Sequence, residues 1–222
     1  MDLDLLVIII IIAATALVSF KGFNDRGFFS QYMFQVGAIQ RNKEYIRLLT
    51  SGFLHADIMH LLFNMLTLFF FSGIVIDYFG KVGFVLIYFG AIIAGNLFSL
   101  FIYKNNPMYS AIGASGGVSG ILFAAIAMNP YLGIGFFFIP IPIPGYIFGA
   151  LYFGYSVYMM LNPKEWDNLG HAAHLGGSVV GLVYAFISFP MNTLEHIFQI
   201  LIMSLPLLYL AFRILFNKGG IR

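Results

Sequence analysis

The chain has 222 residues, of which 60% are hydrophobic and only 9% are charged, and its formal net charge is +2. Soluble globular domains carry about 25% charged residues, so this composition excludes a water-soluble globule and indicates a polytopic membrane protein. The small net charge does not favour nucleic-acid binding, and we expect no nucleic-acid partner. The sequence contains no cysteine, which excludes disulfides, thiol nucleophiles and cysteine metal ligands.

Seven apolar stretches are long enough, or nearly so, to cross about 30 Å of hydrocarbon. The first follows the start "MDLD", whose lack of basic residues favours a spanning helix over a cleaved signal peptide. We therefore expect an all-α polytopic membrane protein with no internal repeat and no separate soluble domain. The predicted spanning helices are Leu3–Phe20, Ala56–Ile76, Lys81–Tyr103, Ile112–Met128, Gly145–Leu161, Gly170–Phe189 and His196–Phe216.

Two linkers between these helices are long. Residues 21–55 hold five of the eleven Lys and Arg residues, yet they include the apolar run "GFFSQYMFQVGAI", so we expect this loop to enter the membrane interface. The second linker, Asn129–Pro144, ends in "IPIPIP", whose prolines exclude a regular helix and predict an extended segment. The link "PMNTLEH" before the seventh helix resembles an ordinary short turn.

Polar side chains gather where the second, fourth and sixth helices begin. The second begins "HADIMHLLFN", which puts His60 and Asn64 one turn apart on one face. The fourth carries Ser115 in "IGASGG", and the sixth carries His174 in "GHAAHLGG". Alternate helices run in the same direction, so these polar residues share one membrane face, about 6 Å below the helix starts. Polar residues inside a membrane are costly and usually functional.

Glycines explain how two of these helices could meet. Gly177 and Gly181 have the small-xxx-small spacing that lets membrane helices touch backbone to backbone, and Gly116 and Gly120 repeat it in the fourth helix. If these faces meet, Ser115 and His174 lie within hydrogen-bond reach. A neutral histidine can then take the hydroxyl proton and activate the serine. Oxyanion donors are available from His60, Asn64 and the Ser115 backbone N–H at a helix start.

These motifs are similar to those of the rhomboid family of intramembrane serine proteases. The matching residues are His55, His60 and Asn64 in "HADIMHLLFN", Gly113 and Ser115 in "GASG", and His174, Gly177 and Gly181 in "AHLGGSVVG". They occur in the family's order, and the likeness covers roughly residues 40–190. The resemblance implies a six-helix core over residues 1–190 around a water-filled cavity, followed by an extra helix and a short tail over residues 191–222.

The resemblance also implies roles for individual residues. Ser115 would be the nucleophile and His174 the general base of a dyad that needs no cofactor. His60, Asn64 and the Ser115 amide would form the oxyanion hole, and Gly113 would shape the turn before the serine. We expect His55 and Arg47 to order the loops rather than to catalyse. The expected substrates are single-pass membrane proteins whose spanning segment unwinds near one end.

Two positions depart from the family pattern. Ile46 precedes Arg47 where the family often has tryptophan, so the anchoring of the first loop differs. Ser119 stands where many members carry an aromatic ring that stacks on the catalytic histidine. Either the base is positioned more loosely, or another aromatic residue substitutes for the missing ring.

The distribution of basic residues bears on the orientation. The usual family orientation would place most of the basic loops outside, whereas the positive-inside rule prefers the reverse. Because the basic residues of the first loop can serve structural purposes, we expect an integral protein of the bacterial cytoplasmic membrane with its site facing outward. The sequence does not indicate an oligomeric state.

Other kinds of function remain open. A transporter or channel would place its polar site near the midplane and often shows repeats, unlike this chain. A non-catalytic protein that binds transmembrane helices is disfavoured by the intact Ser115 and His174. Clustered histidines can bind zinc, but the sequence lacks an H-E-x-x-H motif and we expect no metal. We interpret Asp167 as a solvated loop charge and His171 as an exposed neighbour of His174.

Overall fold

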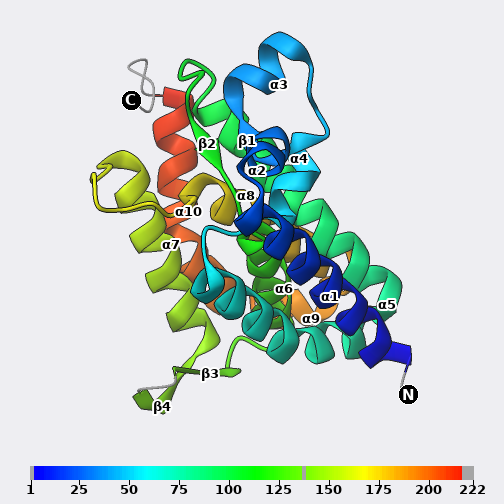
Figure 1. Cartoon of the computed structure of the whole chain (residues 1–222). Coiled ribbons are helices and arrows are strands. Elements are labelled where there is room, and N and C mark those ends of the chain that lie inside the picture. Colours follow the sequence, from blue (N-terminus) through cyan, green and yellow to red (C-terminus); the bar gives the residue numbers. More distant parts are fainter. Residues whose placement is uncertain (1–2, 137–138, 217–222) are drawn as a thin grey trace.

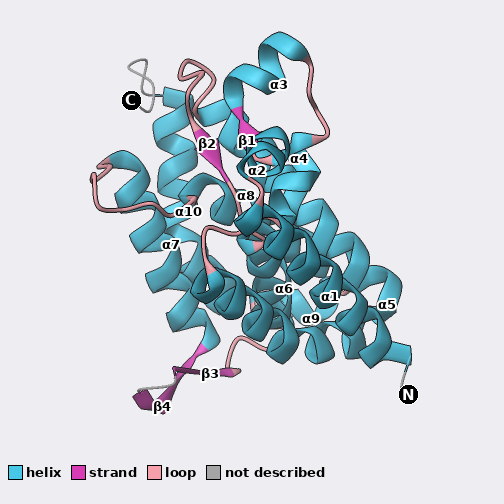
Figure 2. Ribbon diagram, viewed as in Figure 1, coloured by secondary structure: helices cyan, strands magenta, loops and turns pink. Residues whose placement is uncertain are grey.

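The apolar stretches are helical because hydrocarbon offers no water to satisfy backbone polar groups. The computed structural model describes residues 3–136 and 139–216, and its helices form a bundle with two small β pairings (Figures 1 and 2). In that part of the chain, four helices are long and apolar enough to cross a membrane. They are α1 Leu3–Asn24, α5 Ile58–Ile102, α8 His171–Ser188 and α10 Ile197–Phe216. The predicted all-α, multi-pass membrane fold is confirmed.

Helix α5 contains both the second and the third predicted helices. Its 45 residues would extend about 68 Å if straight, roughly twice the thickness of the hydrocarbon. The backbone is not helical at Gly80, where φ is 67° and ψ is 174°, and this break divides α5 into two arms. On the second arm, Asn96 donates to the carbonyl of Leu48 and to Ser51 Oγ, two residues that precede the first arm. The second arm therefore returns to the side where the first begins.

Helix α6, Ser115–Met128, is the centre of the bundle (Figure 1). Every residue from Gly116 to Met128 is buried, and α6 packs mainly against α5 and α8. Helix α7, Gly145–Leu161, packs mainly against α10 and much less against α6 and α8. Helix α10, which the sequence places after the predicted core, is therefore a neighbour of α7.

The first long loop folds into short elements at the end of the bundle where α6 and α8 begin (Figure 1). Its strand β1 pairs antiparallel with β2 just before α6, with Phe34 opposite Ala111. Arg47 is buried, and its Nη1 donates to the carbonyls of Ser30 and Met33 at 2.7 and 2.8 Å. The elements are α2 Arg26–Tyr32, β1 Phe34–Gln35, α3 Val36–Asn42, α4 Arg47–Thr50, the 3-10 turn Ser51–Phe53 and β2 Ser110–Ala111.

The remaining linkers differ in how well the sequence predicts them. The proline-rich linker contains β3 Gly133–Phe136 and β4 Ile139–Pro144, an antiparallel pair, so the predicted extended conformation is confirmed. The expected short turn before α10 was wrong, because Pro190–Glu195 forms the helix α9 with proline at its start, a position that proline favours. The predicted tail after residue 216 and residues 1–2 and 137–138 lie outside the described residues, and the division of the chain at residue 190 stays a prediction.

Candidate active site

Helices α6 and α8 approach each other at backbone distance. A Cβ atom added to Gly177 would overlap the carbonyl oxygen of Gly116, and one added to Gly181 would overlap the carbonyl oxygen of Gly120. No residue other than glycine fits these positions without a shift of the helices. The two predicted glycine pairs thus face each other and set the spacing between the helices.

This close approach brings Ser115 and His174 together. Ser115 is the first residue of α6, and His174 lies in the first turn of α8. His174 Nε2 is 2.7 Å from Ser115 Oγ, although 59 residues separate them in the chain. Both side chains are partly exposed, so a substrate can reach them. The predicted pair is in the geometry that nucleophile activation by a base needs.

The turn before Ser115 depends on Gly113, whose φ of 120° is in the region that favours glycine. The Gly113 N–H donates to the carbonyl of Ser51 at 3.0 Å. Because Ser115 begins a helix, its own N–H has no partner within that helix and is available to an anion. The turn therefore presents a backbone donor beside the serine hydroxyl.

His55 is hydrogen-bonded to the backbone of the same turn. It is completely buried, and its Nε2 accepts from the Ala114 N–H at 3.3 Å. Burial, together with the nearby His60, lowers the pKa of His55 to about 3, so the ring is neutral near neutral pH. Its Nδ1 then carries the proton and donates to Ser19 Oγ at 2.9 Å, and Ser19 donates to the carbonyl of Phe53. His55 thus connects α1 to the turn that precedes the serine.

His60 and Asn64 lie on the first arm of α5 beside this turn. A Cβ atom on Gly113 would lie 2.9 Å from His60 Nε2, so the glycine allows the imidazole to approach the turn. His60 Nδ1 accepts from the Ala56 N–H at 3.4 Å, which leaves the ring proton on Nε2. Asn64 is buried, and its Nδ2 donates to the carbonyl of His60 at 2.9 Å, a bond that uses one of its two hydrogens. His60 therefore has a donor aimed toward the turn, and Asn64 lies one turn deeper.

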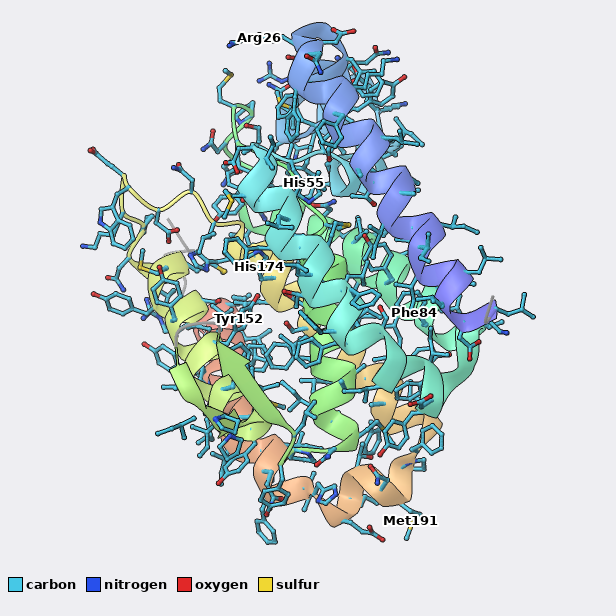
Figure 3. The ribbon with its side chains drawn as sticks, turned by 60° about the horizontal axis from the view of Figure 1, so that its bottom comes forward. Arg26, His55, Phe84, Tyr152, His174 and Met191 are labelled. Carbon is cyan, nitrogen blue, oxygen red and sulfur yellow. The ribbon has the colours of Figure 1, made fainter. Side chains whose placement is uncertain are left out.

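The sequence did not identify the aromatic partner of His174, which comes from α7. The ring of Tyr152 stacks on the imidazole with a centroid separation of 6.1 Å and an interplanar angle of 28°. Both residues are labelled in Figure 3. Its Oη is 2.8 Å from Oγ of Ser119, the residue that replaces the family's aromatic. The sequence left open whether the base is positioned loosely or another aromatic residue substitutes for the ring. The structure shows the second alternative, with Tyr152 on His174. The missing ring at Ser119 was the only signal in the sequence for it.

The interpretations of Asp167 as a solvated charge and of His171 as an exposed neighbour were both wrong. The Asp167 carboxylate is 2.6 Å from His171 Nε2, and each of the two side chains is only 6% exposed. Desolvation opposes ionisation, but hydrogen bonds from His171 and from the Leu169 N–H outweigh it and lower the pKa of Asp167. The His171 ring lies 6.2 Å from that of His174, edge to face. The pair therefore ties the loop before α8 to the helix turn that carries the candidate base.

Arg47 is not part of this cluster, since its hydrogen bonds are all to the first loop. In the described residues, no group of three or more His, Asp or Glu side chains is arranged to hold a metal ion. The site therefore consists of a serine and a histidine, with donors from a helix start and from α5, in a partly exposed position. This arrangement can transfer an acyl group to a hydroxyl and stabilise the oxyanion that forms.

The chain is similar in sequence to known proteins of one family. A family model described as the Rhomboid domain matches residues 42–191. The chain is 31% identical over 149 residues to "Rhomboid protein 1, mitochondrial" of Saccharomyces cerevisiae, covering 64% of this chain and 41% of the yeast protein. It is 35% identical over 92 residues to "Inactive RHOMBOID-like protein 8" of Arabidopsis thaliana, covering 41% of this chain and 26% of that protein. It is 27% identical over 160 residues to "Rhomboid protease GlpG" of Haemophilus influenzae, covering 70% of this chain and 77% of that protein. The chain spans less than half the length of the yeast and plant relatives.

Proposed function

The chain belongs to the rhomboid family, and on this premise we propose that it is an intramembrane serine endopeptidase with Ser115 as nucleophile and His174 as general base. The observation that carries the proposal is the 2.7 Å contact between Ser115 Oγ and His174 Nε2. Relatives of the family include proteins named as proteases and one named as inactive, so the proposal rests on this chain's own site. An inactive helix-binding protein would have no use for a serine hydrogen-bonded to a histidine at a helix start.

The proposed reaction proceeds in two stages. His174 Nε2 accepts the hydroxyl proton while Ser115 Oγ attacks the carbonyl carbon of the substrate peptide. The resulting oxyanion accepts hydrogen bonds from the Ser115 N–H, from His60 Nε2–H and from the Asn64 amide. His174 then donates its proton to the leaving amine, the C–N bond breaks, and an acyl ester remains on Ser115. A water molecule, deprotonated by His174, hydrolyses this ester and restores the dyad.

The substrate follows from the position of the dyad at the starts of α6 and α8. A peptide bond within a spanning helix is inaccessible, because its carbonyl is hydrogen-bonded and lipid leaves any freed group unsatisfied. We therefore propose single-pass membrane proteins whose segment unwinds near the membrane face that holds the dyad. Glycine weakens a helix by about 1 kcal/mol relative to alanine, so glycine-containing segments are the best candidates.

The sidedness stays a prediction, with the site facing outward from a bacterial cytoplasmic membrane. Helix α1 begins at one end of the bundle and α10 ends at the other, the end where the first loop lies (Figure 1). A reporter fused after α10 should therefore lie on the same side as the dyad. A reporter found in the cytoplasm would reverse the predicted orientation without affecting the chemistry.

The proposal is tested by cleavage in detergent micelles and in liposomes. The purified protein is incubated with a single-pass test substrate that carries a glycine-containing segment, and the products are identified by mass spectrometry. Ser115→Ala and His174→Ala should abolish cleavage. The matched control is Ser72→Ala, since Ser72 is a buried serine whose hydroxyl donates to the carbonyl of Leu68 in its own helix, and this variant should cleave like the wild type. Equal cleavage by Ser115→Ala would overturn the proposal.

A further inference from the structure

We propose that Tyr152 is a positioning residue for the general base, and that α10 holds it there through α7. This inference rests on the proposed function of Ser115 and His174. It also gives a role to α10, the helix that follows the predicted six-helix core, for which the sequence suggested none. Three observations support it. The ring of Tyr152 stacks on His174, its hydroxyl is hydrogen-bonded to Ser119, and α10 packs against the turn of α7 that precedes Tyr152.

The ring of Tyr152 is held on more than one side. Its hydroxyl shares a hydrogen bond with Ser119 on α6, 2.8 Å away. Its ring also lies 5.4 Å from that of Phe123 on α6 and 5.9 Å from that of Phe148 on α7. Stacked on His174 at 28°, it limits rotation of the imidazole about its side-chain bonds. The imidazole can keep Nε2 directed at the serine only if such rotation is restricted, because misplacement of a reacting group costs rate steeply.

The ring is carried by α7, and α7 is held chiefly by α10. Met203 is fully buried and is one of two buried residues on the described part of α10, the other being Leu210. A Cβ atom on Gly149, three residues before Tyr152, would overlap Met203 Sδ. Met203 therefore packs directly against the turn of α7 that presents the tyrosine.

The contact between Gly149 and Met203 is the close contact between α7 and α10 that lies nearest to Tyr152 in the chain. Farther along, an open pocket of about 340 Å³ lies between the two helices, lined among others by Gly154, Tyr158 and Pro206, while the buried Leu210 keeps part of α10 packed in the core. The beginning of α10 is anchored separately, since Gln199 Nε2 donates to the hydroxyl of Tyr131, in the loop after α6. Loss of the Met203 side chain would therefore loosen α7 within one turn of Tyr152.

The first experiment measures kcat and KM for Tyr152→Leu. We expect kcat to fall about 3- to 10-fold, the effect of losing one aromatic pair, with KM nearly unchanged because the ring acts on the base. Tyr158→Leu is the matched control, since Tyr158 is an exposed tyrosine two turns later on the same helix, and it should keep wild-type kcat. A rise in KM with kcat unchanged would overturn the positioning role and assign Tyr152 to substrate contact instead.

The second experiment moves the ring from α7 to α6. Tyr152→Ser should lower kcat, and adding Ser119→Tyr should restore it, because the two side chains touch and the ring would reach His174 from the other helix. Met203→Ala should lower kcat in the wild-type background by a similar factor, whereas the exposed Leu205→Ala on the same helix should not. In the swapped background Met203→Ala should leave kcat unchanged, since the ring no longer depends on α7.

These results separate the inference from the proposed function. Cleavage that depends on Ser115 but is equal in the wild type and in Tyr152→Leu would overturn the inference alone. A Met203→Ala effect that persists undiminished in the swapped background would assign α10 a general stabilising role and would also overturn it. Cleavage that does not depend on Ser115 would overturn both.

Discussion

The backbone contact between α6 and α8 gives the sharpest prediction, tested by Gly177→Ala. The added carbon would overlap the carbonyl oxygen of Gly116 and lie 2.7 Å from its carbonyl carbon; since ordinary contact begins near 3.4 Å, the contact with the carbon alone requires the helices to separate by about 0.7 Å. The same displacement would stretch the 2.7 Å hydrogen bond between Ser115 and His174 to about 3.4 Å, beyond a normal O–H···N distance. We expect kcat to fall about 10²-fold and stability to fall by about 1–3 kcal/mol.

The assay pairs cleavage of the test substrate with the unfolding midpoint in mixed micelles containing SDS. Gly90→Ala is the matched control, because Gly90 also faces α8 but a Cβ atom there would lie 3.8 Å from Val180, at ordinary contact distance. That variant should keep wild-type stability and activity. If Gly177→Ala matched Gly90→Ala in both measurements, the claim that the glycines set the geometry of the dyad would be refuted.

Three further predictions concern residues around the dyad. Asn64→Ala should lower kcat by at most about 10²–10³-fold, the cost of one oxyanion donor, because the Ser115 N–H and His60 share the task, and single-turnover kinetics would measure it. Because the pKa of His55 is lowered in the folded protein, the free energy of unfolding should be highest above the unfolded pKa of about 6.5 and should decline as pH falls toward 3, by up to about 1.4 kcal/mol per pH unit. His55→Gln should remove this pH dependence from the free energy of unfolding. Because the pKa of Asp167 is lowered in the folded protein, its contribution to stability is present above about pH 3.9 and is lost as pH falls through its folded pKa. Asp167→Asn should therefore approach wild-type stability only in that acid range. A difference in stability between the two proteins that stayed the same at acid pH would contradict the ion pair.

Much of the site could be predicted because it depends on direction and spacing along helices. Ser115 and His174 each lie near the start of a helix, and alternate helices share a direction, so their place at the same end of the bundle followed from the sequence. The spacing of Gly177 and Gly181 matches one face of a helix, and the complementary pair on α6 predicted their meeting. These features are periodic, and the helical repeat converts them into positions in space.

Other features depend on which surfaces meet, and periodicity does not encode that. Tyr152 is one of several aromatic residues on α7, and only the packing of α7 beside α6 and α8 selects it as the ring on His174. Asp167 belongs to a loop whose polar sequence predicts exposure to solvent. The Asp167 side chain is buried because this loop folds back onto the first turn of α8. The helix α9 was missed because a six-residue helix is too short to show a repeat.

The measurement that tests the central claim most directly is covalent labelling of the serine. The protein is treated with a fluorophosphonate, whose phosphorus is attacked by an activated serine Oγ with loss of fluoride, and the adduct is located by peptide mass spectrometry. We expect the adduct on Ser115 in the wild type and almost none in His174→Ala, with Ser110 and Ser119 unmodified in both. Labelling of another residue, or equal labelling of Ser115 when His174 is replaced, would contradict the assignment of the dyad.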